Sequence, residues 1–110
     1  MKPEELNQLL ESPSQFKEIW LDGENGSKLC ALINGDIGWL MYLRFEGDAG
    51  FSSRNPHISS EEDVEFILNN GQRDVYPKNW TYHVSKLSGA MRSFLQDGKL
   101  PSQLEWHDDR

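Results

Sequence analysis

The sequence has a single cysteine, few cations and no long apolar run. Cys30 has no second cysteine to pair with, so no internal disulfide forms and a reducing compartment, the cytoplasm, is expected. No segment approaches the ~20 apolar residues of a membrane-spanning helix, and residues 1–10 lack the apolar stretch of a secretory signal. The 11 Lys and Arg are outnumbered by 18 Asp and Glu. The resulting formal charge of −7 disfavours binding to nucleic acids or anionic membranes and favours a basic partner.

Motifs of the common catalytic and cofactor sites are also missing. The three histidines, His57, His83 and His107, show no metal-ligand spacing, and no glycine-rich phosphate loop is present, so we expect neither metal nor cofactor. Ser52 and Ser53 do not fit the G-x-S-x-G nucleophile motif. Carboxylates are abundant, however, and a small enzyme that uses a carboxylate pair therefore remains an alternative.

The first half of the chain predicts a helix followed by three strands. Pro3 and the leucines that follow it predict a short helix, which Pro13 stops. Residues 16–21 and 29–33 flank a turn rich in Gly, Asn and Asp, as in a β-hairpin. Residues 37–45 predict a central strand that is buried on most of both faces.

The second half predicts short strands and one long helix. A strand at 51–54 is followed by a hairpin, with one strand at 64–68 and an irregular return strand at 74–83. Apolar spacing predicts an amphipathic helix over 85–97, capped by Ser85 or Ser88. A closing strand is expected at 104–106. Residues 1–110 therefore predict a single α+β domain, a mainly antiparallel sheet of about four to six strands with both helices packed on it.

The aromatic residues divide into two groups by their surroundings. Those in apolar runs are expected in the core: Trp20, Trp39, Tyr42, Phe45 and Trp106. Three others stand among polar and turn residues, where a large ring can stay exposed as an interface anchor: Phe51, Tyr76 and Trp80.

An acidic block runs from Glu46 to Glu65. One interpretation is a solvated loop in which Ser60 caps a helix, and the other is an anionic surface that docks on a basic patch. The second interpretation, combined with the exposed aromatics, predicts these partner-binding residues: Asp48, Phe51, Ser53, Arg54, Glu61, Glu62, Asp63, Glu65, Tyr76 and Trp80.

The C-terminal region carries a distinctive pattern. An amphipathic helix and a polar bend precede Pro101-Ser102-Gln103-Leu104-Glu105-Trp106, a Pro-x-x-apolar-x-Trp ending. With the strand Asp36 to Tyr42 and the segment Gly50-Phe51-Ser52-Ser53, this resembles the first-named immunity family of bacterial polymorphic toxin systems, from about Ile33 onward. The resemblance implies an α+β fold in which Pro101 and Trp106 are structural, with Trp106 packed against Phe94 or Leu95.

The same resemblance implies a non-enzymatic function. The chain would bind a cognate toxin domain tightly inside a bacterial cell, and the acidic charge suggests a nuclease or a nucleic-acid deaminase with a basic active-site face. The alternatives are the carboxylate-pair enzyme and a structural or oligomerisation subunit without a toxin partner. A neighbouring gene that ends in a toxin domain would favour the first function, and a metabolic operon would favour the enzyme. The oligomeric state stays open.

Overall fold

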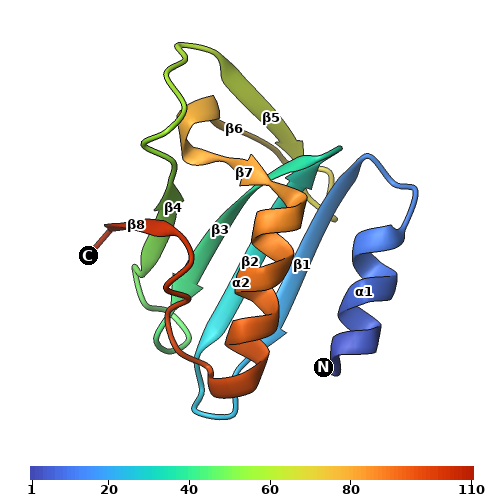
Figure 1. Ribbon diagram of the computed structural model, residues 1–110, viewed down its shortest axis with the longest axis vertical. Coiled ribbons are helices and arrows are strands. Elements are labelled where there is room, and N and C mark those ends of the chain that lie inside the picture. Colours follow the sequence, from blue (N-terminus) through green and yellow to red (C-terminus); the bar gives the residue numbers. More distant parts are fainter.

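The two helices lie on one side of a six-stranded sheet, and a separate two-stranded hairpin lies on the other. The computed structural model describes residues 1–110, and Figure 1 shows α2 in front of the sheet with α1 beside β1. The elements are α1 (Pro3–Glu11), β1 (Phe16–Asp22), β2 (Lys28–Asn34), β3 (Ile37–Leu43), β4 (Phe51–Arg54), β5 (Asp63–Ile67), β6 (Arg73–Pro77), η1 (Lys78–Trp80), β7 (Tyr82–His83), α2 (Val84–Asp97) and β8 (Glu105–Asp108). The predicted α+β class is confirmed.

The main sheet is antiparallel and has the order β1-β2-β3-β4-β8, with β7 paired to β3. The predicted hairpin of β1 and β2 and the central position of β3 are confirmed. β5 and β6 pair only with each other, and the turn at Asn69 to Gly71 joins them as predicted. Neither α1 nor α2 combines the length and the apolar character that crossing a bilayer requires.

Strand β2 is buried on both faces, which explains its unbroken apolar sequence. Leu29, Ala31 and Ile33 pack into the core beneath the helices, while Cys30 and Leu32 pack beneath the hairpin. Cys30 is buried, and this burial raises the pKa of its thiol to about 12. The thiol is therefore protonated at neutral pH.

Helix α2 contributes the apolar face that its spacing predicts. Four of its side chains are buried in the helix-side core: Leu87, Ala90, Met91 and Phe94. The predicted serine caps are wrong, because His83 caps the helix by accepting a hydrogen bond from Ser85 N through Nδ1 at 3.1 Å. An imidazole nitrogen supplies the same acceptor as a serine hydroxyl at this position.

The C-terminal end of α2 is fixed to the sheet through Gly98. This residue adopts the left-handed conformation, with φ of 68°, as its position after the helix predicts. Its carbonyl oxygen accepts hydrogen bonds from Ser27 Oγ at 2.6 Å, Tyr42 Oη at 3.0 Å and Asn25 Nδ2 at 3.3 Å. The helix end is thereby joined to the β1–β2 turn and to β3.

Two aromatic residues predicted in the core are exposed. Trp20 is 44% exposed because it lies on the hairpin-side face of edge strand β1, which the hairpin covers only in part. Phe45 is 54% exposed because β3 ends at Leu43 and the residue falls in the following loop. The local apolar runs do not reveal which strand face another layer covers, so both predictions are wrong.

Two smaller differences concern the polar segments. No helix follows Ser60, whose hydroxyl accepts a hydrogen bond from Glu62 N before β5 begins. The closing strand extends from Glu105 to Asp108 rather than from 104 to 106, because β4 offers it four residues to pair with.

Replacing Trp106 with phenylalanine is expected to lower the free energy of unfolding by about 1 to 2 kcal/mol. Trp106 is half-buried against the helix-side core, and its indole N–H donates to the carbonyl of the buried Pro101 at 2.7 Å. Phenylalanine keeps the packing but leaves that carbonyl without its donor. Chemical denaturation checks the value.

Trp20→Phe is the matched control, because the Trp20 indole donates to Glu18, a surface carboxylate that water can hydrate instead. Its change should stay within about 0.5 kcal/mol. Equal losses in the two variants would contradict the role of the Pro101 carbonyl.

Candidate functional site

An aromatic and cationic stack joins four elements on the hairpin side of the sheet. The Trp39 ring of β3 stacks on Tyr76 of β6, with centroids 4.4 Å apart and planes at 13°. Tyr76 in turn stacks on Trp80 of η1 at 5.8 Å, and the Arg54 guanidinium of β4 lies 3.5 Å from the centroid of the Trp80 ring. This arrangement brings together three predicted site residues, Tyr76, Trp80 and Arg54, and adds Trp39, which the sequence places in the core.

The stack is half-buried and packed on its neighbours rather than freely exposed. Tyr76 and Trp80 are of intermediate exposure, and the Tyr76 hydroxyl donates to Asp74 at 3.2 Å. Burial, together with the Asp74 carboxylate, raises the pKa of Tyr76 to about 12. Tyr76 is thus a neutral phenol at physiological pH, and its ring presents one edge of a fixed aromatic surface.

Ser53 and Asn55 hold this surface from beneath. Ser53 is fully buried, and its hydroxyl donates to the Trp80 carbonyl at 2.9 Å while accepting from Leu40 N at 3.1 Å. Asn55 N donates to the Asn79 carbonyl at 2.7 Å, and Asn55 Nδ2 donates to the Thr81 carbonyl at 3.0 Å. Ser53 therefore supports the surface and does not form part of it, in contrast to its predicted place.

The predicted acids lie at the start and along the length of the hairpin. Glu61, Glu62 and Asp63 are exposed. Glu62 makes an ion pair with Lys78 at 3.4 Å and Glu65 makes one with Arg73 at 3.0 Å, whereas Glu61 and Asp63 make none. Together with the stack, these acids form what we call the hairpin surface: Arg54, Glu61, Glu62, Asp63, Glu65, Tyr76 and Trp80.

Asp48 and Phe51 lie apart from the hairpin surface. The Asp48 carboxylate accepts from Arg44 Nε at 2.8 Å and Nη2 at 2.9 Å, and its side chain is only 3% exposed. The Arg44 guanidinium holds the pKa of Asp48 well below its usual range. Phe51 packs on the helix side of the sheet, 6.2 Å from the Tyr42 ring, with the Arg110 guanidinium 4.9 Å from its own ring.

Comparison with protein families matches residues 3–108 to "Immunity protein Imm1". The chain belongs to the Imm1 family. The match confirms the resemblance that the Pro101 to Trp106 ending indicates, and it makes the chain an immunity protein whose partner is a cognate toxin. A search of curated proteins found no match.

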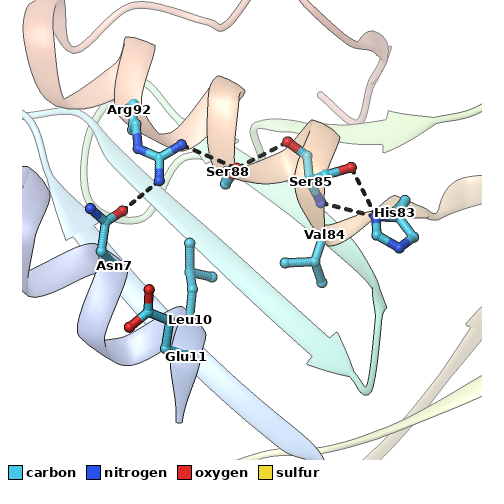
Figure 2. A pocket seen from close by; sticks show the side chains of 8 residues that line it. All are labelled: Asn7, Leu10, Glu11, His83, Val84, Ser85, Ser88 and Arg92. Carbon is cyan, nitrogen blue, oxygen red and sulfur yellow. Dashed lines mark hydrogen bonds between the residues drawn. The ribbon is translucent and has the colours of Figure 1, made fainter.

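In this Imm1 protein, the largest pocket lies between α1 and the start of α2 and has a volume of about 420 Å³. Figure 2 shows that its polar side chains bind one another: Arg92 donates to Asn7 and to Ser88, and Ser88 donates to the Ser85 carbonyl. These contacts join the two helices. None of the predicted partner-binding residues lines the pocket, so we assign it a structural role.

Proposed function

We propose that this Imm1 protein neutralises a toxin that acts on nucleic acid, either a nuclease or a nucleic-acid deaminase, by covering its basic substrate-binding face. The binding is placed in the bacterial cytoplasm, in keeping with a single, buried and unpaired thiol. The protein acts as an inhibitor by binding alone. The observation that carries the proposal is that the exposed acids of this strongly acidic immunity protein lie beside a packed aromatic stack.

Charge complementarity supports this class of toxin. An enzyme that acts on nucleic acid carries lysine and arginine along the path of the phosphate backbone. A partner with a formal charge of −7 is attracted to such a face over several ångströms, and the attraction accelerates the encounter. Glu61, Glu62 and Asp63 are consecutive and exposed, so they place three carboxylates where a basic face would meet them.

The aromatic stack supports tight binding after the encounter. Tyr76, Trp80 and Arg54 belong to the residue types that dominate binding energy at protein interfaces. Because Trp39 and Ser53 hold these groups in place, little side-chain freedom is lost when a partner covers them. We therefore assign the acids mainly to the association rate and the stack mainly to the dissociation rate.

Replacing Glu61, Glu62 and Asp63 together with alanine is expected to slow association and to flatten its dependence on salt, because rim charges act through long-range attraction. The probe is a catalytically inactivated toxin domain encoded by the neighbouring open reading frame, and surface plasmon resonance at two ionic strengths measures both rates. Thermal stability should be nearly unchanged, since these side chains are exposed.

The matched control replaces Glu4, Glu5 and Glu11 of α1 with alanine. Both triple variants move the formal charge from −7 to −4, but α1 lies on the helix side of the sheet. Only in the hairpin variant should the association rate lose most of its dependence on salt. Equal effects of the two variants would place the interface elsewhere, and a wild-type chain that does not bind the toxin would contradict the proposed function.

A further inference from the structure

The hairpin covers only part of the sheet face on which it lies. Its buried residues Val64 and Phe66 pack with Cys30, Leu32 and Trp39. The same face continues past the hairpin in two rows of residues that are paired across neighbouring strands. One row consists of Trp20, Cys30, Met41, Ser52 and His107, and the other consists of Asp22, Lys28 and Leu43. We call the part of these rows on β1 to β3, with the adjoining Phe45 loop, the open face.

Trp20 is an exposed but fixed ring on this face. It is 44% exposed, although its indole N–H donates to Glu18 Oε2 at 2.7 Å. The other oxygen of the Glu18 carboxylate accepts from Asn69 N at 2.9 Å, so the hairpin turn holds the same carboxylate. A tryptophan that is positioned before a partner arrives has the properties of an interface anchor.

Phe45 is a second exposed ring, and its loop is held just as firmly. The Asp48 carboxylate accepts three hydrogen bonds from Arg44, through N, Nε and Nη2, and closes the loop that carries Phe45. The same Arg44 guanidinium lies 5.4 Å from the centroid of the Phe45 ring. The backbone N–H of Asp48 also donates to the Phe45 carbonyl at 3.1 Å. The fold thus uses an ion pair, in which the Asp48 side chain is buried and the Arg44 side chain is 42% exposed, to hold the loop of an aromatic residue that is 54% exposed.

Acidic groups border both rings. Asp22 pairs with Lys28 at 2.7 Å, and Asp22, followed by the more distant charge of Glu46, raises the pKa of Lys28. Lys28 pairs with Leu43, the last residue of β3, so the loop that carries Phe45 and Glu46 begins beside Lys28, at this end of the open face. Asp22 and Glu46 thus border this end of the open face, and Glu18 borders Trp20.

We infer that the toxin docks on the open face as well as on the hairpin surface, with Trp20 and Phe45 seated in apolar depressions of the toxin and its lysines and arginines against the bordering acids. This inference rests on the proposed function and names further anchors for the same partner. Met41 follows Trp39 by two residues on the same strand face, so the open face is continuous with the aromatic stack.

The test uses Trp20→Ala and Phe45→Ala against the inactivated toxin domain of the neighbouring open reading frame. Each variant should weaken binding at least about tenfold, mainly through faster dissociation. The matched controls are Leu9→Ala and Leu100→Ala, which truncate exposed apolar residues outside the open face and should change affinity less than about twofold. Circular dichroism checks that every variant is folded, and Phe45 keeps the test decisive if Trp20→Ala unfolds, because it lies in a loop.

Three outcomes would contradict the inference. If both aromatic variants bind the toxin as tightly as the wild type does, the toxin does not dock on the open face, and the proposed role of the hairpin surface is unaffected. A wild-type dimer that Trp20→Ala or Phe45→Ala converts to a monomer would show that a second copy of this chain covers the face instead. Absence of wild-type binding would overturn the proposed function together with this inference.

Discussion

Replacing Phe94 with alanine is expected to lower the free energy of unfolding by about 3 to 5 kcal/mol, as truncation of a large aromatic residue in a packed core does. Phe94 is fully buried between α2 and the sheet. Its ring meets the Tyr42 ring edge to face, with the two centroids 6.1 Å apart and the ring planes at 81°. The variant loses both the buried surface and this contact with β3, and it leaves a cavity between the helix and the sheet. Urea or guanidinium denaturation measures the change.

Leu100→Ala is the control for Phe94→Ala, because Leu100 is 37% exposed just beyond the same helix. Its loss should stay within about 0.5 kcal/mol. A Phe94→Ala protein that unfolds at the wild-type denaturant concentration would contradict the position assigned to α2 on the sheet.

Gly50→Ala is expected to destabilise the domain by about 2 to 5 kcal/mol through two separate effects. Gly50 has φ of +77°, a conformation that costs an alanine roughly 1 to 2 kcal/mol. An added Cβ would also lie 2.4 Å from the backbone oxygen of Tyr42, and a backbone oxygen inside a sheet cannot move aside as a side chain can. Overpacking of this kind costs roughly 1 to 3 kcal/mol.

Gly47→Ala separates these two effects. Gly47 lies in the same loop with φ of +88°, but no atom lies within 4 Å of the position its Cβ would take. Its loss should therefore be only the conformational part, about 1 to 2 kcal/mol. Denaturation curves of the two variants give the difference, and equal losses would show that the Tyr42 carbonyl is not a steric barrier.

The elements that local patterns specify could be predicted from the sequence. Helix α2 follows from its apolar spacing and from Gly98, and the β1–β2 hairpin follows from the Gly and Asn of its turn. The cap could not be assigned in the same way, because His83 also closes β7 and its role depends on where that strand ends. Residue type alone favours serine there.

The candidate site was less accessible to sequence reasoning because strand coverage is a tertiary property. Alternation along β1 places the Trp20 side chain on the other face of the strand from Ile19 and Leu21. It does not predict that the hairpin leaves Trp20 uncovered. Phe51 illustrates the converse: its polar neighbours suggest exposure, yet its face of β4 lies toward the helices. The polar and turn residues around Tyr76 and Trp80 predict them, and Arg54 is predicted because it lies in the acidic block, whereas an apolar run hides Trp39.

The hydrogen bonds of Asn55 to Asn79 and Thr81 bear on how this domain can diverge in evolution. They bring the two ends of segment 56–80 together, so the whole hairpin departs from and returns to one point of the domain. A segment closed at its base tolerates changes in length and sequence better than a strand within the sheet does. The helix-side core contains no residue of this segment. Residues 56–80 can therefore change to give a new binding specificity while the helices and the helix-side core keep their sequence constraints, and only the hairpin-side face of the sheet, where Cys30, Leu32 and Trp39 pack with Val64 and Phe66, has to change with them.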